Sequence, residues 1–165
     1  MGKQKIEKTN AVRLLDRAGV RYELVPYDVD EADLSAVHVA ATLGEPVGRV
    51  FKTLVLHGDR NGYLVCIIPG ACEVDLKAAA RASGNKSVAM IPMRDLLAVT
   101  GYIRGGCSPI GMKRRFATYI DSSCNDLDYI YISAGVRGLQ LKIAPGALIA
   151  FVGAGVCALT GDAGE

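Results

Sequence analysis

The chain has 165 residues, of which 50% are hydrophobic; it can bury one core but is too short for two ordinary domains. Its 19 basic and 17 acidic residues leave a formal net charge of +2, so the overall field does not indicate a nucleic-acid partner and any polyanion must be held locally. We expect a single domain over residues 1–165, with its core at about residues 9–150.

The first predicted helix begins at a Thr9 cap and ends at Gly19, because the apolar residues between them recur at helical spacing. Residues 20–27 alternate apolar and charged side chains, which predicts a strand at the edge of a sheet. A second helix is expected between a Ser35 cap and Gly44.

Residues 50–56 and 63–68 are two apolar runs rich in β-branched side chains. The Asn61-Gly62 pair between them suits the positive φ values of a tight turn. These runs therefore predict a β-hairpin.

In the second half of the chain, Asp75 can cap a helix that ends near Gly84, and a short helix is predicted over residues 93–99. Further strands are expected at about residues 117–120, 129–133 and 139–143. Helices that precede and interrupt a set of strands predict an α+β fold with a curved, mixed sheet.

The cysteines and the termini bear on the compartment. Five cysteines without a C-x-x-C pair argue against a disulfide framework and against a zinc site. Residues 1–8 have no apolar run for a signal peptide, and Ile6 stands where a myristoylation motif has Ser or Thr. Residues 146–159 have the length of a buried core element rather than a membrane span. We expect a cytoplasmic protein with no metal, no cofactor and no membrane partner.

Lys52 is the one charge in residues 50–56, a strand whose two faces both look buried. Burying an ammonium group costs on the order of several kcal/mol unless the group is paired or its pKa falls. Either Lys52 has a function, or its stem packs near the strand end while its head reaches solvent.

Residues 101–111 contain four glycines and a proline, so they cannot form regular structure. Glycines let backbone N–H groups approach a ligand, and Ser108 adds a hydroxyl, so this loop could receive a carbonyl or phosphate oxygen. It could equally be a plain connection. Residues 133–138 form a similar joint, which either completes the same pocket or simply turns a corner between strands.

The remaining candidate groups, which are a basic run, two histidines and a cysteine, give weaker indications of a site. The basic run at residues 113–115 follows the glycine loop and suits either phosphate contacts or a solvated face. His38 and His57 are the two histidines, which makes metal-dependent hydrolysis an unfavoured reading. Cys107 has no flanking base or orienting acid, so a small apolar role is favoured over a nucleophile.

Four segments together resemble the YbaK/EbsC family in their order and spacing: residues 9–13, Phe51-Lys52-Thr53-Leu54-Val55, residues 101–111 with Gly-Gly-Cys-Ser-Pro, and residues 133–138. The resemblance runs from about residue 9 to residue 148. This family consists of aminoacyl-tRNA editing deacylases, either free-standing or inserted into prolyl-tRNA synthetases. The resemblance implies a barrel-like mixed sheet with surrounding helices.

The resemblance also implies roles for individual residues. Lys52 matches the family's functional lysine, which would hold the aminoacyl ester or the terminal adenosine by charge and hydrogen bonding. The implied substrate-binding residues are Tyr27, Gly105, Gly106, Ser108, Ser133, Gly135 and Gln140. In members that clear cysteinyl-tRNA, the substrate's own thiol attacks its ester, so the enzyme mainly positions the substrate and excludes water.

Two departures from the family bear on the amino acid that is removed. Gln140 stands where cysteine-specific members carry an aspartate, and Ser35 or Ala36 replaces a pocket phenylalanine. Cysteine on proline tRNA is the leading expectation and alanine is an alternative. The expected activity is trans-editing deacylation of mischarged aminoacyl-tRNA, with the substrate thiol or a water as nucleophile and prolyl-tRNA synthetase as a second candidate partner. The rival reading is a non-catalytic module that binds aminoacyl-tRNA or a synthetase.

Overall fold

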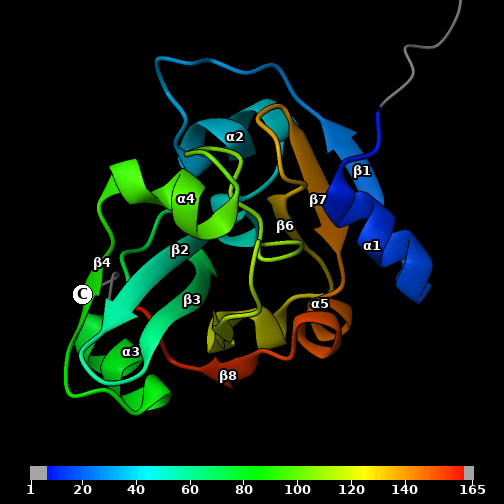
Figure 1. Ribbon diagram of the computed structural model, residues 1–165. Coiled ribbons are helices and arrows are strands. Elements are labelled where there is room, and N and C mark those ends of the chain that lie inside the picture. Colours follow the sequence, from blue (N-terminus) through cyan, green and yellow to red (C-terminus); the bar gives the residue numbers. More distant parts are fainter. Residues whose placement is uncertain (1–6, 162–165) are drawn as a thin grey trace, which may run out of the picture.

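A computed structural model describes residues 7–161 of the chain (Figure 1). Most of the N-terminal stretch on which the targeting expectation was based, including Ile6, lies outside these residues. No helix in the described part is long and apolar enough to cross a membrane.

Residues 7–161 form five α-helices, three short 3₁₀-helices and eight strands. The α-helices are α1 (Asn10–Ala18), α2 (Ala36–Leu43), α3 (Leu76–Ser83), α4 (Leu96–Thr100) and α5 (Pro145–Val152). The strands are β1 (Glu23–Pro26), β2 (Phe51–Gly58), β3 (Gly62–Pro69), β4 (Val88–Met90), β5 (Ala117–Asp121), β6 (Ile130–Ser133), β7 (Leu139–Ile143) and β8 (Gly155–Cys157). The 3₁₀-helices are η1 (Val47–Arg49), η2 (Met93–Asp95) and η3 (Ser122–Asp126).

The predicted helix boundaries at α1, α2 and α3 are confirmed by their cap contacts. The N-cap residues are Thr9, Ser35 and Asp75. The side-chain oxygen of each accepts a hydrogen bond from a backbone N–H of the first turn of its helix. Each helix ends at a glycine whose φ of 71° to 74° lies in the left-handed region, at Gly19, Gly44 and Gly84.

The α+β class is confirmed, whereas the single sheet expected is two sheets. One is antiparallel with the strand order β1-β7-β6, and the other is mixed with the order β4-β2-β3-β5-β8. Over residues 7–161 the two sheets are joined by backbone pairing only at an isolated parallel bridge between Val50 and Tyr131. The expected barrel-like closure is therefore not confirmed.

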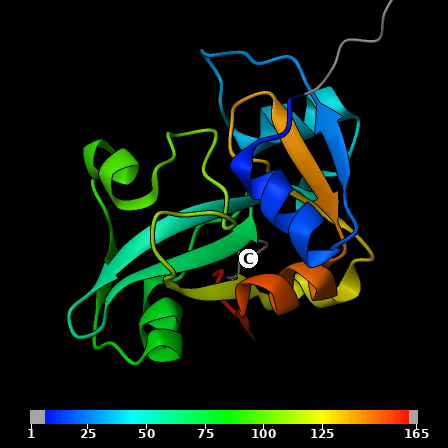
Figure 2. The same cartoon turned by 45° about the vertical axis from the view of Figure 1, so that its right-hand side comes forward.

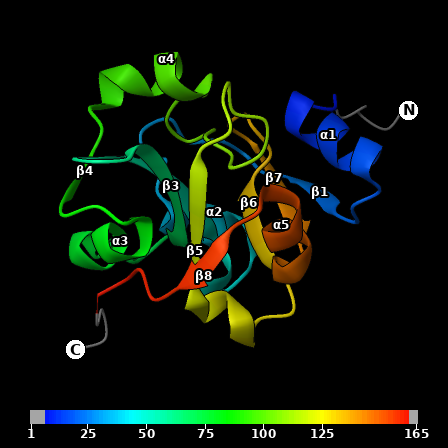
Figure 3. The same ribbon diagram turned by 60° about the horizontal axis from the view of Figure 1, so that its bottom comes forward.

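The main core lies between the two sheets and is covered by α1 and α5 (Figure 2). Leu15 of α1 and Leu148 of α5 are both fully buried there. On the other face of the β2–β3 hairpin, α3 packs against Leu56 and Leu64 (Figure 3). A third, smaller cluster lies beneath α2 and includes Tyr131. The hairpin thus has apolar contacts on both faces.

Several elements differ from the sequence-based expectations. The strand expected over residues 20–27 is shorter, because the N–H of Val20 still bonds to the Leu15 carbonyl behind α1. Residues 146–159 are not one buried element: α5 ends at Val152, before the cap residue Gly153, and Val156 of β8 is 41% exposed. The three-residue strands β4 and β8 were not predicted, since runs so short show no periodicity.

β8 pairs in parallel with the end of β5 and extends the folded part past residue 150. The buried Asp121 carboxylate at this end accepts hydrogen bonds from the N–H of Leu159 at 2.8 Å and the N–H of Ser123 at 3.2 Å. These contacts tie the C-terminal segment to the mixed sheet.

Gly70, which follows β3, tests the packing between the hairpin and α2. A Cβ at Gly70 would lie 1.9 Å from the Cβ of Ala36, so Gly70→Ala should destabilise the protein by roughly 2–4 kcal/mol. At Gly146 in α5 a Cβ would meet nothing within 4 Å, so Gly146→Ala should be neutral or stabilise by up to about 1 kcal/mol. Urea unfolding of both variants measures the contrast, and equal effects would contradict the packing described.

Candidate active site

A cavity of about 410 Å³ opens where the two sheets separate. Its walls come from β2, the start of α2, the stretch from β4 to η2, the glycine loop, and the ends of β6 and β7. In Figure 1, α2 and α4 lie on the same side of β2 and flank this region. The cavity thus gathers parts of the chain that are far apart in sequence.

Five of the expected site residues line this one cavity: Lys52, Tyr27, Gly105, Ser133 and Gln140. Ser133 and Gln140 are directly opposite each other in the β6–β7 ladder. Both are almost buried, at 8% and 5% exposure. The chain therefore brings the lysine strand, the glycine loop and the second Gly-rich joint together.

The other three expected site residues, Gly106, Ser108 and Gly135, are not among the residues that line the cavity. A Cβ at Gly106 would lie 3.2 Å from the Cα of Val136, so this glycine allows the two loops to pack closely. The Ser108 hydroxyl is fully buried and accepts a hydrogen bond from the N–H of Ile110 at 3.2 Å. These contacts support the loops, and a role in substrate binding stays a prediction for all three residues.

Tyr102 packs between the glycine loop and the loop at residues 133–138. Its hydroxyl donates to the carbonyl of Ile110, and a Cβ at Gly135 would lie 3.2 Å from its ring. Burial raises the pKa of Tyr102 to about 12, so the hydroxyl stays protonated as a donor at neutral pH. Gly135, with φ of 110°, adopts a conformation that residues with a Cβ rarely take.

Lys52 is partly buried and makes no ion pair within 4.0 Å with any residue from 7 to 161. Burial lowers the pKa of the Lys52 ammonium below its ordinary value of 10.5, and the nearby Cys72 and Glu73 act in the opposite direction. An unpaired cation in a cavity wall is available to an anionic or carbonyl oxygen.

Cys107 lines the cavity, but its environment does not activate it. Burial raises the pKa of the Cys107 thiol to about 12, with a smaller opposing effect from Thr100. The thiol is therefore protonated at neutral pH, and a protonated thiol is a poor nucleophile. Neither histidine lines the cavity: His57 packs edge-on against Tyr63, and His38 lies 4.0 Å from the carboxylate of Asp33.

Three groups in the cavity wall were missed from the sequence. Thr53 follows Lys52, and its hydroxyl oxygen is buried without a hydrogen-bond partner among the described residues, as is Oε1 of Gln140. Arg104 adds a cation from the glycine loop, and Met93 brings an exposed apolar side chain from η2. Thr53 could have been suspected from its place beside the lysine, whereas the other two are placed by tertiary structure.

Comparison with known proteins decides the family. The model of the aminoacyl-tRNA editing domain matches residues 31–151, which includes all the cavity residues named above except Tyr27. The chain belongs to the aminoacyl-tRNA editing domain family.

Individual proteins similar to this chain have names that refer to tRNA editing or to proline–tRNA ligase. The chain is 49% identical, over 90% of its length and 92% of the relative, to a protein of Enterococcus faecalis named "Putative Cys-tRNA(Pro)/Cys-tRNA(Cys) deacylase EbsC". A proline–tRNA ligase of Fervidobacterium nodosum is 34% identical over 48% of this chain and 14% of the ligase. A solved structure described as "a putative trans-editing enzyme for prolyl tRNA synthetase" has the same fold, with a TM-score of 0.80 and 22% identity over 94% of this chain and 99% of that one.

Ser35 and Ala36, at the position of the phenylalanine departure, both line the cavity of this editing domain. The Ser35 hydroxyl already caps α2 by accepting from the N–H of His38 at 3.2 Å. Ala36 is held against Gly70. Both side chains are small, so the apolar lining next to them comes from Leu34 and Val39.

Lys52 should cost the editing domain stability at neutral pH. Because its pKa is lower in the folded than in the unfolded chain, protonated Lys52 disfavours folding below the folded pKa, and this cost disappears as pH rises toward 10.5. Lys52→Met should therefore stabilise on the order of 1 kcal/mol at pH 7, with a smaller gain at alkaline pH. Urea unfolding against pH measures this, with the exposed Lys77→Met as a control expected to change little. A loss of stability in Lys52→Met would contradict the assigned environment.

Proposed function

We propose that this chain is a trans-editing deacylase that clears mischarged aminoacyl-tRNA, chiefly cysteinyl-tRNA(Pro). The observation that carries the proposal is the Lys52 ammonium, which forms no ion pair with residues 7–161 and lines a cavity with Tyr27, Ser133 and Gln140, in a chain of the editing family. The name of the relative from Enterococcus faecalis supports cysteine as the amino acid. Proteins of this kind act in the cytoplasm, where charged tRNA is used.

Lys52 acts as a clamp in this proposal. Its ammonium binds the ester carbonyl or an oxygen of the terminal adenosine, and the charge stabilises the oxyanion that develops when the carbonyl is attacked. Gly105, with φ of 85°, allows the backbone of the glycine loop to lie close against the amino acid. The cavity thus supplies position and charge.

The substrate's own thiol supplies the nucleophile. Its sulfur attacks the ester carbonyl, the C–O bond to the ribose breaks, and the thiol proton passes to the ribose oxygen, which leaves free tRNA and a cyclic thioester. The protonated Cys107 and the absence of histidines from the cavity wall fit a site without an activated nucleophile of its own. A water could replace the thiol for other amino acids, at a lower rate.

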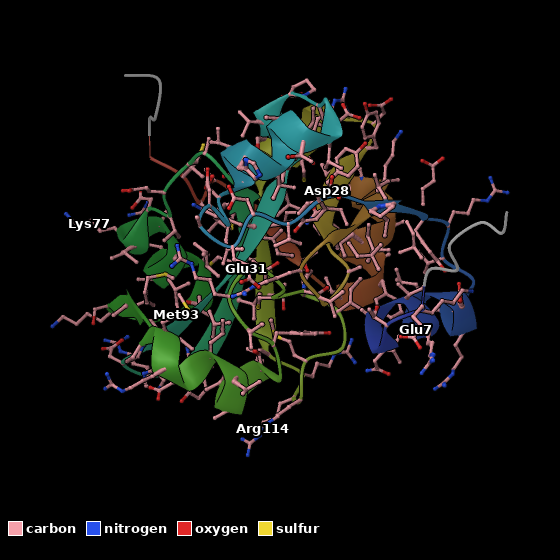
Figure 4. All side chains as sticks on the ribbon, turned by 90° about the horizontal axis from the view of Figure 1, so that it is seen from above. Glu7, Asp28, Glu31, Lys77, Met93 and Arg114 are labelled. Atoms are coloured by element: carbon pink, nitrogen blue, oxygen red, sulfur yellow. The ribbon has the colours of Figure 1, made fainter. Side chains whose placement is uncertain are left out.

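Charge around the cavity favours one direction of approach for the RNA. On the side of α4, Arg104 lines the cavity, and Arg94 and Arg114 are further exposed cations. Before α2, residues 28–33 carry four exposed carboxylates. Figure 4 shows Asp28 on the α2 side, and Met93 and Arg114 on the α4 side. The phosphates of the acceptor end should therefore lie over α4.

Deacylation of a panel of mischarged tRNAs tests the activity. The protein should release cysteine from tRNA(Pro) faster than alanine or proline, and Lys52→Ala should lower kcat/KM by about 100-fold or more. Lys77→Ala on α3 is the matched control and should retain full activity. The panel should be run with and without prolyl-tRNA synthetase, because the weak net charge leaves room for a partner that supplies tRNA specificity.

The rival candidate is a non-catalytic module that binds aminoacyl-tRNA or a synthetase. It predicts binding of a non-hydrolysable aminoacyl-adenosine analogue with no turnover in any member of the panel. Activity that survives Lys52→Ala unchanged would reject the clamp instead.

Paired charge reversals test the direction of approach. Arg94→Glu with Arg114→Glu should weaken binding of tRNA roughly 10- to 100-fold and lower the slope of log K against log[salt] by about 2. Lys77→Glu with Arg81→Glu, on the separate surface of α3, makes the same change in net charge and should have a much smaller effect (Figure 4). Equal effects of the two pairs, measured by filter binding, would show that only net charge matters.

A further inference from the structure

One edge of β2 is only partly covered. β4 pairs with β2 along Leu56 to Gly58, and the N–H of Ile91 extends this contact to the Val55 carbonyl at 3.2 Å. At the other end, Val50 forms the bridge to Tyr131. No strand of residues 7–161 pairs with this edge between these contacts, and Thr53 lies at the middle of the gap.

The register of the hairpin shows which way the backbone of Thr53 faces. The N–H of Gly70 donates to the Val50 carbonyl at 2.8 Å, and the next pair joins Phe51 to Pro69, which has no N–H. In an antiparallel ladder, bonded and non-bonded pairs alternate. Thr53 therefore belongs to the set with Phe51 and Val55, whose N–H and C=O groups point away from β3. The bond from Ile91 to Val55 on that outer edge agrees.

The gap faces the cavity. Residues 51–55 all line it, as do Met90 and Ile91 at the end of the β4 contact. Two of the residues that line the cavity, on different sheets, have a buried side-chain oxygen with no hydrogen-bond partner among the described residues: Oγ1 of Thr53 and Oε1 of Gln140. Gln140 is 5% exposed, so it has little access to bulk water. Buried acceptors without partners are costly, and a ligand with N–H donors would satisfy them.

The size of the gap limits what can bind there. A peptide that added a strand to this edge would need several consecutive free residues, whereas only the stretch around Thr53 is free. A compact donor fits better. The Thr53 carbonyl, the Thr53 hydroxyl and the Gln140 amide oxygen are three acceptors, and an ammonium group has three N–H donors.

We propose that Thr53 and Gln140 bind the α-ammonium group of the aminoacyl ester, an inference that rests on the proposed function. Neighbouring residues of a strand point to opposite faces, so the Thr53 hydroxyl and the Lys52 side chain leave β2 on different sides. A neutral amide at position 140 binds the amine without a full charge. The amine is then recognised by groups that take no part in the chemistry of the ester.

Two substrates that differ only in the amine test this assignment. Cysteinyl-tRNA(Pro) and 3-mercaptopropionyl-tRNA(Pro) share the thiol and the ester, but the second lacks the ammonium group. The ratio of their kcat/KM values should fall about 10-fold in Thr53→Val, which removes the hydroxyl and keeps the shape. Thr53→Ser, which keeps the hydroxyl, should preserve the wild-type ratio. Gln140→Leu should lower the ratio as Thr53→Val does.

The ratio separates recognition from damage to the fold. A loss of structure lowers both rates together, so a Thr53→Val variant with an unchanged ratio would overturn the proposal, whatever its absolute activity. Lys52→Ala should lower both rates and leave the ratio as in the wild type, which identifies a clamp on the ester. If the wild-type protein releases neither acyl group, the proposed function itself fails, and the assignment of Thr53 fails with it.

Discussion

Antiparallel pairing of β2 with β3 over eight residues fixes the strand whose residues 51–55 all line the cavity. The hairpin has apolar contacts on both faces, with the main core on one side and α3 on the other. Its register places Lys52 opposite Ile68 and leaves the outer edge of β2 to the cavity. A slip of one residue would exchange the faces of Lys52 and Thr53 and separate the lysine from its site. The hairpin is therefore both the scaffold and the centre of the site.

The separation of the two sheets produces the space in which a ligand can bind. One continuous sheet would pair the edge of β2 with β6 and fill the position of the cavity with backbone hydrogen bonds. The chain instead makes one bridge at Val50 and then diverges, and polar groups at Thr53, Ser133 and Gln140 face the opening. The cost of a partly buried lysine and two unpartnered oxygens is typical of a site that retains function at the expense of stability.

Local signals in the sequence predicted the fold well where one residue decides a boundary. The caps at Thr9, Ser35 and Asp75 and the Asn61-Gly62 turn are short-range effects of side chains on their own backbone. The strands β4 and β8 and the division into two sheets depend on contacts between distant segments. No pattern within a window of the sequence encodes such contacts.

The sequence predicted some residues of the candidate site and missed others. Lys52 stands out as a charge in an apolar strand, and the glycine loop stands out by composition. Physical reasoning alone did not decide whether Lys52 and the glycine loop belong to a site. The resemblance to a family assigned both to one site with Tyr27, Ser133 and Gln140. Lys52, Gly105 of the loop and these three residues line the same cavity. Thr53 was not singled out from the sequence, because its significance lies in the missing neighbour of β2. Gly106 and Gly135 belong to the glycine-rich segments that the sequence singled out. Their close contacts are with Val136 and Tyr102 of the protein itself rather than with the cavity.

The anchoring of the chain end at Asp121 affects how this fold can be cut or transplanted. The match to the family model stops at residue 151, before β8 and before Leu159, whose N–H satisfies the buried Asp121 carboxylate. A fragment ending at that boundary would keep every cavity residue but would leave the buried Asp121 carboxylate with the N–H of Ser123 and without the N–H of Leu159. A fusion that inserts this domain into a larger enzyme must therefore place its exit after residue 160, beside Val74, to which Thr160 forms an isolated antiparallel bridge.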